Sequence, residues 1–536
     1  MRLANSSLSE RRISVIEFIL IVITAAIPLL FQHPYRINLF LAWEGAYRMS
    51  IGEIPYRDFG SPVGYGFWVL PAIFFRLFGP YVFTLLITQT FINIASGLIF
   101  RAMLKKFEVA PAARFLSLLV YCLSYSMFNF WPWYNHLVFV VELAGLYVLC
   151  AEILKAPEMR RPWLIVISSF LIAFSFMIKQ DTGALGLLIA IAILIFDFTF
   201  ERKFRSSLLF IAGYAASMLV LIVPFLQYEF TYWFNFGQHP HNPRVDKFDL
   251  INEFLGASDF IKFYLLIFVV IVISQIEVWY TSRNKLSMLF ALVVLCILGQ
   301  AAIIQVTSYT PIDGNIYFHS FVFAFILQFL SRSFDLQRVP SFAALSFFVV
   351  LWWSGVFWTR FLKDRLRPVL MGKNDSENVI SKRTYLLSGD TLQFSRSKWV
   401  VPQIPSFRRI KIPADTEKGT LQLMEMPEVK KPGVKILNMS ELTSLAFDMK
   451  YELERGANYP LWFHKGVSFF DREVDTFCER VEKRDWDVIL FEDIPNVNQF
   501  YPYEVRDCVK KNYRFRYRFL APRIPEISYI EVYTKE

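Results

Sequence analysis

Acidic and basic side chains crowd one stretch of the chain, residues 41–68, which reads LAWEGAYRMSIGEIPYRDFGSPVGYGFW and follows the first apolar segment. It contains the acids Glu44, Glu53 and Asp58 and the bases Arg48 and Arg57. A carboxylate at the mouth of a membrane bundle can act as a general base toward an acceptor that attacks at the lipid surface. The same side chains could instead pair with one another on a solvated amphipathic loop. Spacing alone leaves both interpretations open.

The composition predicts a polytopic membrane protein. Of 536 residues, 55% are hydrophobic and 18% aromatic, and the mean hydropathy is +0.39. Such values are not expected of a soluble chain of this size. The formal net charge of +10 does not predict a nucleic-acid partner, because Lys and Arg of membrane proteins collect in cytoplasmic loops. Arg2, Arg11 and Arg12 precede an apolar run with no small-residue cleavage site, which predicts a retained first span.

A membrane-spanning helix needs about 20 apolar residues. Eleven segments are predicted to span: 14–31, 82–100, 114–130, 136–154, 163–178, 183–199, 207–226, 261–279, 286–306, 317–333 and 341–358. A twelfth apolar segment, 62–79, is ambiguous because it contains Pro71 and, near its end, Arg76.

The distribution of basic residues favours an interfacial or re-entrant helix for 62–79. If it does not cross and the N-terminus is cytoplasmic, nearly all basic loops face inward, as the positive-inside rule requires. The inward residues are then Arg101, Lys105, Lys106, Arg114, Lys155, Arg160, Arg161, Arg202, Lys203, Arg205, Arg283, Lys285, Arg332 and Arg338. The protein is then expected in a plasma or inner membrane with its C-terminal part extracytoplasmic. Five bases on the predicted outer side oppose this topology unless they bind lipid phosphate: Arg360, Lys363, Arg365, Arg367 and Lys373.

Polarity rises sharply near residue 360. From there onward the chain has 31 Lys and Arg and 26 Asp and Glu, more than half of its charged residues. We therefore expect a transmembrane domain over 1–359, with a first outer loop at 32–81, and a small α/β domain over 360–536. Strands are predicted at 434–439, 487–495 and 527–535. Cys478 and Cys508 share this domain, and sequence does not show whether they lie close enough to form a disulfide.

This topology places every histidine of the chain at or near the outer face: His33, His136, His239, His241, His319 and His464. Either histidine simply tolerates interfaces and loops, or the outer face carries a polar reaction site.

The first loop resembles the first-loop signature of the GT-C glycosyltransferases, which include the protein O-mannosyltransferases and the lipid A aminoarabinose transferases. The matching pattern is WEGAYRMSIGEIPYRDFGSPVGYGFW, followed by FFRLFG. WPWYNHL (131–137) and IKQDTG (178–183) are weaker matches, and the resemblance covers the membrane domain to about residue 200. It implies transfer of a sugar, usually with inversion, from a polyprenyl-phosphate carrier to a glycan, lipid or protein acceptor on the outer face. It also implies a juxtamembrane helix where charge bias places 62–79.

The chain departs from this family at one informative position. Many members have Asp-Glu before the glycine, with the Asp as the presumed base, whereas this chain has Trp43 followed by Glu44. Either Glu44 or Asp58 then acts as the base, the other orienting the acceptor, or activity is altered or lost.

Basic and polar residues of the predicted outer loops are candidates for binding substrate. Arg57, Lys179 and Arg244 are the candidates for the donor phosphate, although Lys179 could simply pair with Asp181. His239 and His241 could bind sugar or phosphate, or cap the bundle. The sugar pocket could include two further residues, Tyr134 and Asn135, unless they belong to an interfacial aromatic belt.

No cofactor is predicted. The His239-x-His241 pair does not establish a metal site, because no carboxylate or cysteine stands at a matching spacing. Glu142 lies within a span, where it either hydrogen-bonds to a neighbouring helix or has a functional role. Two other functions remain: a transporter of lipid-linked sugars, which would need ionisable residues along a pathway through the spans, and a catalytically inactive binding protein.

Overall fold

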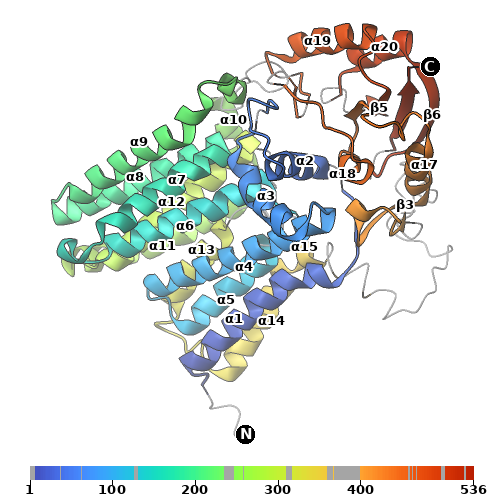
Figure 1. Ribbon diagram of the computed structural model, residues 1–536. Coiled ribbons are helices and arrows are strands. Elements are labelled where there is room, and N and C mark those ends of the chain that lie inside the picture. The colour runs from blue at the N-terminus through green and yellow to red at the C-terminus, as the bar shows by residue number, and fades with distance from the viewer. Residues whose placement is uncertain are drawn as a thin grey trace.

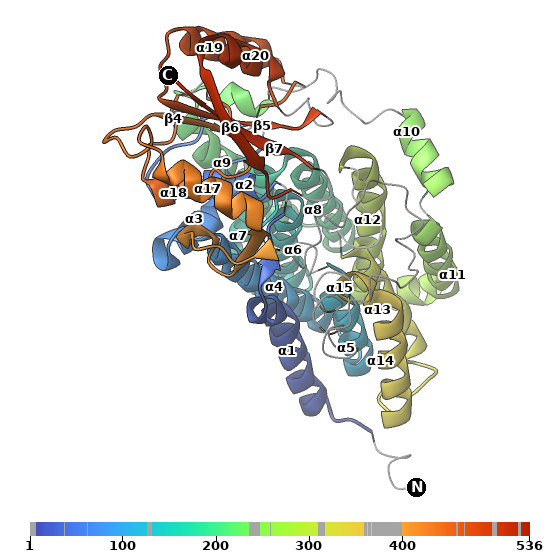
Figure 2. The same cartoon turned by 90° about the vertical axis from the view of Figure 1, so that its right-hand side faces the viewer.

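The computed structural model describes the chain except for residues 1–6, 37, 62, 126–130, 235–246, 258, 309–316, 359–361, 363–365, 367–398, 457–458, 462, 466, 496–500, 524–526 and 536. It consists of a helical bundle with a smaller mixed α/β region at one end, above the connection that contains α2 and α3 (Figure 1). The first turn of α1 (Glu10–Ala26) lies at the opposite end of the bundle (Figures 1 and 2).

Each of the eleven predicted segments contains a helix. They are α1 (Glu10–Ala26), α4 (Val82–Lys106), α5 (Pro111–Val120), α6 (Tyr134–Ile153), α7 (Pro162–Ile178), α8 (Gln180–Glu201), α9 (Arg205–Ile222), α11 (Asp259–Thr281), α12 (Lys285–Ser308), α13 (Phe318–Leu330) and α14 (Val339–Trp353). Among the described residues, seven helices are long and apolar enough to cross a membrane: α1 with its 3₁₀ extension, α4, α6, α8, α9, α11 and α12. The other four, α5, α7, α13 and α14, are apolar and shorter, so the described residues contain seven long spans together with shorter apolar helices.

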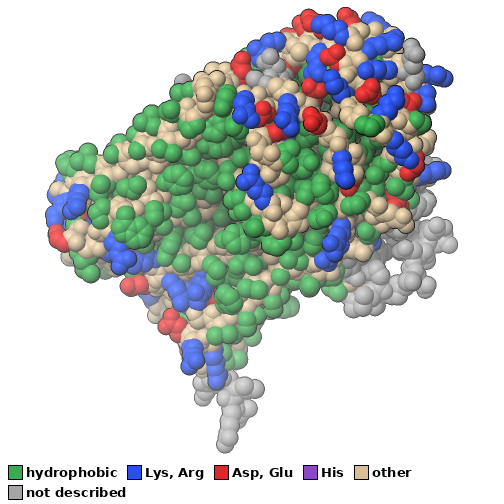
Figure 3. Space-filling model, viewed as in Figure 1, with side chains coloured by type: hydrophobic (Ala, Val, Ile, Leu, Met, Phe, Trp, Pro, Cys, Tyr) green, Lys and Arg blue, Asp and Glu red, His purple; other side chains and the backbone are tan. Residues whose placement is uncertain are grey.

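The surface of the bundle is apolar between two polar ends. Figure 3 shows hydrophobic side chains over the bundle, bounded by the charged C-terminal region and by Lys and Arg at the opposite end. Exposed apolar side chains are frequent on the outward faces of α9 and α11, including Leu219 and Ile273. A belt of this kind is expected of helices in contact with lipid.

Ion pairs and hydrogen bonds gather the basic connections at the end of the bundle that lies away from the C-terminal region. Arg160 and Lys285 share the carboxylate of Asp197. At the same end, the N–H of Leu8 donates to the carbonyl of Gln337 at 3.1 Å. The loops that the positive-inside rule assigns to one side therefore do meet at one end of the fold.

The ambiguous segment forms α3 (Gly66–Phe78), which packs against α2 (Leu39–Ser50) with both helices running in the same direction. The guanidinium of Arg76 donates to the carbonyls of Ser50 (2.9 Å) and Met49 (3.3 Å), which are exposed at the C-terminus of α2. At the other end of the pair, the indole of Trp68 donates to Leu41 at 2.8 Å. Arg76 therefore joins two short helices of the first loop, a role consistent with a helix that does not cross.

The C-terminal region contains two sheets. The larger has strand order β4-β5-β7-β6, with β4 parallel to β5 and the other pairs antiparallel. Its elements are β4 (Ile436–Met439), β5 (Val488–Asp493), β6 (Arg514–Leu520), β7 (Tyr529–Thr534), α17 (Ala414–Glu425), α18 (Leu445–Met449), α19 (Phe470–Glu482) and α20 (Tyr503–Asn512). The predicted strands correspond to β4, β5 and β7. Cys478 of α19 and Cys508 of α20 form a disulfide with a Cα–Cα distance of 5.6 Å.

The smaller sheet joins the first loop to the C-terminal region. Its order is β1-β3-β2, with β1 (His33–Pro34) parallel to β3 (Ile410–Pro413) and β2 (Trp399–Val400) antiparallel to it. A buried cluster lies nearby, in which Arg523 bonds to Glu441 and Glu492, each at 2.8 Å. Glu441 in turn accepts from the backbone N–H of Asn38 in the first loop. The two predicted domains are thus joined by a shared sheet and a buried ionic cluster.

Candidate functional site in the first outer loop

Asp58 lies in a tight turn that its own side chain stabilises. Its Oδ2 accepts from the N–H of Ile54 at 2.7 Å, and its own N–H donates to the carbonyl of Ile54 at 2.9 Å. Within this turn Tyr56 adopts φ 66°, and its N–H donates to the carbonyl of Phe59 at 2.7 Å. The turn directs the carboxylate of Asp58 toward the surface, where 15% of the side chain is exposed.

The guanidinium of Arg57 grips the carboxylate of Asp58. Its Nη2 donates to Oδ2 at 2.6 Å and its Nε to both oxygens at 3.1 Å. Partial burial raises the pKa of Asp58, but the bonds from Arg57 and from the Ile54 N–H outweigh that effect and hold the pKa below its ordinary value. Asp58 is therefore ionised, while the side chain of Arg57 is 44% exposed.

Backbone bonds from the C-terminal region hold this turn in place. The N–H of Gly456 donates to the carbonyl of Asp58 at 2.9 Å. Gly60 donates to Tyr459 at 2.8 Å and accepts from Leu461 at 2.9 Å. The candidate base therefore lies between the membrane bundle and the C-terminal region, with backbone contacts on the latter.

Glu44 has a different environment, because it is buried at 1% exposure in an ionic network. Arg48, one helical turn later, donates to Glu44 Oε1 through Nη2 at 2.7 Å and to Glu53 through Nη1 at 2.8 Å. Arg455 of the C-terminal region completes the network with a 2.8 Å bond to Glu53. Burial raises the pKa of Glu44, and the adjacent Arg48 acts to lower it. This carboxylate supports the loop from inside and is not open to solvent.

Trp43 occupies the position where many members of the family that the first loop resembles have an acid, and it is fully buried. Its indole N–H donates to the carbonyl of Pro80 at 2.8 Å, and its ring stacks on Tyr47 with centroids 4.6 Å apart. The side chain thus packs α2 against the segment that follows α3 and presents no group to a substrate.

Lys179 lies at the sharp turn between α7 and α8, near the first loop. Its Nζ is 2.9 Å from Asp181 Oδ2, so the ion pair considered from sequence is present. Gly64 packs directly on this turn, since a Cβ there would lie 1.9 Å from the carbonyl oxygen of Met177. The first loop, at Gly64, and the end of α7 that precedes Lys179 are thus in close backbone contact.

The N-terminus of α6 approaches the same region. The ring of Tyr134 packs edge-on against Phe67 of α3, with centroids 5.9 Å apart. The next residue, Asn135, has a buried Oδ1 with no hydrogen-bond partner among the described residues. An acceptor of this kind can receive a hydroxyl hydrogen from a bound sugar.

Three of the predicted substrate-binding residues, His239, His241 and Arg244, fall outside the described residues. In the part of the chain that the structure describes, no group of three His, Cys, Asp or Glu side chains could hold a metal ion. Glu142 accepts from Gln300 at 2.8 Å and from Tyr317 at 3.1 Å, which agrees with the interpretation as a partner of neighbouring helices.

Two contacts from the C-terminal region could not be predicted from sequence. Arg455 acts electrostatically on Asp58 and pairs with Glu53. Tyr232, between α9 and α10 (Lys247–Asn252), donates to Glu473 of α19 at 2.5 Å. Both link residues hundreds of positions apart, and no local pattern indicates such pairs.

No protein-family model and no curated protein sequence match the chain. By structure it is similar to ArnT from Cupriavidus metallidurans in the apo state, with 12% identity, a TM-score of 0.48, and coverage of 98% of this chain and 99% of that one. It is also similar to the arabinofuranosyltransferase AftD from Mycobacteria, with 13% identity, a TM-score of 0.43, and coverage of 100% of this chain and 40% of that one. A third match is the oligosaccharyltransferase of Archaeoglobus fulgidus in complex with Zn and sulfate, with 12% identity, a TM-score of 0.42, and coverage of 95% of this chain and 74% of that one.

These three proteins have the GT-C fold, the group that the first loop of this chain resembles. At these identities and scores the likeness does not extend to activity, substrate or the role of any residue.

Proposed function

We propose that the protein is a membrane glycosyltransferase that moves a sugar, with inversion, from a polyprenyl-phosphate donor to an acceptor on the outer face. The observation that supports this most is the environment of Asp58: an ionised, partly exposed carboxylate in the first loop, paired with an exposed arginine and fixed by its backbone. An acceptor hydroxyl needs such a base at the lipid surface.

Of the two candidate acids, Asp58 fits the role of base. Glu44 is buried and bonded to Arg48, so an acceptor could not approach it without disruption of the network. We assign a structural role to Glu44. Through Arg48 and Glu53 it holds α2 in position relative to the turn that contains Asp58.

The proposed reaction uses Arg57 as a group that changes partner. A donor phosphate attracts the Arg57 guanidinium. The guanidinium can donate two N–H hydrogen bonds to the phosphate, in place of those that it donates to Asp58. Asp58, released, accepts the proton of the acceptor hydroxyl as the acceptor oxygen bonds to the anomeric carbon. The bond from that carbon to the phosphate oxygen breaks, and the electron pair leaves with the phosphate.

Other residues are proposed to hold the donor. Lys179 is a second cation for the phosphate, since its ion pair with Asp181 is partly exposed. Tyr134 and Asn135 are proposed to contact the sugar. His239, His241 and Arg244 remain proposals for the same pocket.

Two features support an extracytoplasmic C-terminal region. The basic connections gather at the end of the bundle away from that region, as the positive-inside rule expects of the cytoplasmic side. Disulfides such as Cys478–Cys508 persist in oxidising compartments and are rare in the cytosol.

The buried ionisable residues of the bundle do not favour a transporter. Glu17 pairs with Arg101 and Arg114, and Asp197 pairs with Arg160 and Lys285. The buried Glu142 bonds to Gln300 and Tyr317. Among the described residues, these interactions tie helices together and outline no path between the two faces.

The experiment is sugar transfer in membranes that contain the wild-type protein, with a panel of polyprenyl-phosphate sugars. The proposal expects transfer from at least one donor and its loss in Asp58→Asn. If the folded wild-type protein binds a donor but transfers no sugar, the alternative of a catalytically inactive binding protein, suggested by Trp43, would be favoured.

A further inference from the structure

We propose that the chain binds the headgroup of an anionic phospholipid in a pocket at the basic end of the bundle, opposite the Asp58 site. The pocket has a volume of about 110 Å³ and lies between the α6–α7 and α8–α9 connections. Its lining includes Glu158, Arg160, Lys203, Arg205 and Ser206. Basic pockets between transmembrane helices on the cytoplasmic side are suited to phospholipid headgroups.

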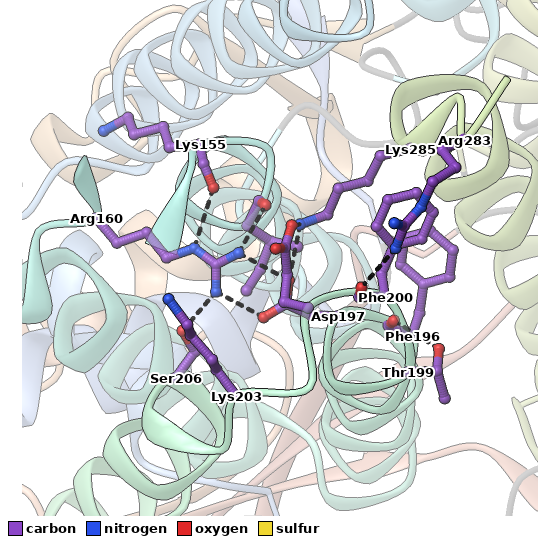
Figure 4. Close-up of polar contacts among 12 residues, drawn as sticks. Lys155, Arg160, Phe196, Asp197, Thr199, Phe200, Lys203, Ser206, Arg283 and Lys285 are labelled. Carbon is purple, nitrogen blue, oxygen red and sulfur yellow. Dashed lines mark hydrogen bonds and ion pairs between the residues drawn. The ribbon is translucent and has the colours of Figure 1, made fainter. Parts of the chain in front are cut away.

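Arg160 forms the rigid back wall of this pocket. Its guanidinium donates to both oxygens of Asp197 (2.6 and 2.8 Å), to Ser206 at 2.8 Å, and to the carbonyls of Lys155 and Ile153, both at 3.2 Å (Figure 4). Lys285 also donates to Asp197, at 2.9 Å. Arg160 is thus fully engaged and holds α7, α8 and α9 in position around the cavity.

The cations available to a ligand are Lys203 and Arg205. Lys203 is 54% exposed, and its one ion pair among the described residues is with Glu158 across the pocket, which is 68% exposed. Arg205 is exposed and makes no ion pair with any described residue. An ion pair this exposed is weak, so a phosphate group can displace Glu158 from Lys203.

Two helices begin at this pocket and add to its preference for anions. Pro162 and Arg205 are the first residues of α7 and α9, and both line it. The free backbone N–H groups of a helix N-terminus favour a negative charge. Together with Lys203 and the Arg205 side chain, they define a site for a phosphate diester.

The apolar surroundings assign this phosphate to a lipid. Trp163 at 54%, Phe204 at 60% and Leu208 at 66% exposure lie beside the pocket on the outward surface of α7 and α9. Aromatic side chains at this position are typical of the membrane interface, and Leu208 lies where acyl chains would run. A free phosphate would gain nothing from these side chains.

The test measures retention of phosphatidylglycerol and phosphatidylcholine by the full-length protein in mild detergent, using native mass spectrometry. We expect one tightly held phosphatidylglycerol and little phosphatidylcholine. The double substitution Lys203→Gln and Arg205→Gln should weaken phosphatidylglycerol binding by about tenfold or more, because each cation near a membrane surface contributes to the attraction. Arg202→Gln, an exposed charge in the same connection that does not line the pocket, should change it little.

Glu158→Gln provides a test in the opposite direction. It removes the carboxylate that competes for Lys203, so phosphatidylglycerol retention should rise severalfold. Equal retention by the double variant and Arg202→Gln would overturn the proposal, as would no change in Glu158→Gln. Displacement of the lipid by millimolar inorganic phosphate would overturn its assignment to a lipid. Sugar transfer is not needed for any of these measurements, so their outcome is independent of the proposed activity.

Discussion

Asp58 and Glu44 show how two carboxylates in one loop acquire different roles. Asp58 keeps contact with solvent and is held ionised by Arg57 and a backbone N–H. Glu44 is removed from solvent and matched to a buried arginine. At the scale of single residues, burial and partners therefore separate a reacting group from a supporting one, although the sequence presents both as acids close to glycines.

Glu44→Gln should destabilise the protein by about 3 kcal/mol, because it leaves the buried Arg48 with one carboxylate fewer. Thermal unfolding in detergent measures this. Glu452→Gln, an exposed acid of the C-terminal region, is the control and should leave the midpoint nearly unchanged. Equal midpoints for the two variants would show that the network does not support the fold.

Glu473 predicts a pH dependence of stability. Burial raises its pKa to about 8 from an ordinary value of 4.5, although the bond from Tyr232 and the nearby Arg472 act to lower it. The folded protein then keeps a proton that the unfolded chain releases. Its contribution to the free energy of unfolding is therefore complete below pH 4.5 and is lost as pH rises to about 8.

Glu473→Gln should flatten this part of the pH profile, by up to about 1 kcal/mol per pH unit. Unfolding midpoints across this range measure it. Asp475→Asn, on the exposed side of the same helix, should keep the wild-type slope. If the stability of Glu473→Gln depended on pH as steeply as that of the wild type, Glu473 would not be the source of the pH dependence.

At the scale of elements, the site depends on how closely the first loop approaches the α7–α8 turn. Gly64 allows its backbone to touch Met177, and Gly183 allows α8 to fold back on α7, since a Cβ there would lie 2.4 Å from Phe176 Cα. Close approaches of this kind need residues without a side chain.

Gly64→Ala should therefore move the loop away from α7. We expect it to lower the free energy of unfolding by at least about 1–3 kcal/mol and to reduce transfer by moving Asp58. Gly299→Ala, where a Cβ meets nothing within 4 Å, is the matched control and should be neutral or slightly stabilising. A Gly64→Ala protein with wild-type stability would show that this contact is not tight.

Sequence predicts these elements unevenly, for physical reasons. The bundle helices are predictable because long apolar runs are typical of membrane-spanning helices. The interfacial or re-entrant helix expected at α3 was predicted from Arg76 and from the distribution of basic residues. Strand β6 reads RFRYRFL and was not predicted, although its alternation of Arg with aromatic residues is the pattern of a half-exposed strand. The bonds of Gly456, Arg455 and Glu473 to the bundle could not be predicted, because they depend on how distant segments pack.

At the scale of the whole molecule, the C-terminal region and the first loop behave as one structure. They share the β1-β3-β2 sheet, the Glu441–Arg523 cluster and the backbone bonds at Asp58 and Gly60. The chain therefore changes composition near residue 360, as polarity predicted. The segments before and after this boundary nevertheless pack against one another. A movement of the C-terminal region would also move the candidate base.

The disulfide tests both the stability and the orientation of this unit. Replacement of Cys478 and Cys508 by serine should lower the free energy of unfolding by about 2–4 kcal/mol. Wild-type protein from intact cells should resist alkylation at both cysteines until it is reduced. Free thiols at these positions before reduction, or a cytoplasmic signal from a reporter fused at residue 400, would contradict an extracytoplasmic C-terminal region.

The most direct test of the central claim compares sugar transfer by Asp58→Asn and Glu44→Gln, per folded molecule, with an active polyprenyl-phosphate donor. If Asp58 is the base, Asp58→Asn should lower transfer by roughly 10²–10⁴-fold. Glu44→Gln should retain transfer within about tenfold of the wild type once its lower stability is taken into account. Full transfer by Asp58→Asn, or a loss confined to Glu44→Gln, would contradict the assignment of Asp58 as the base.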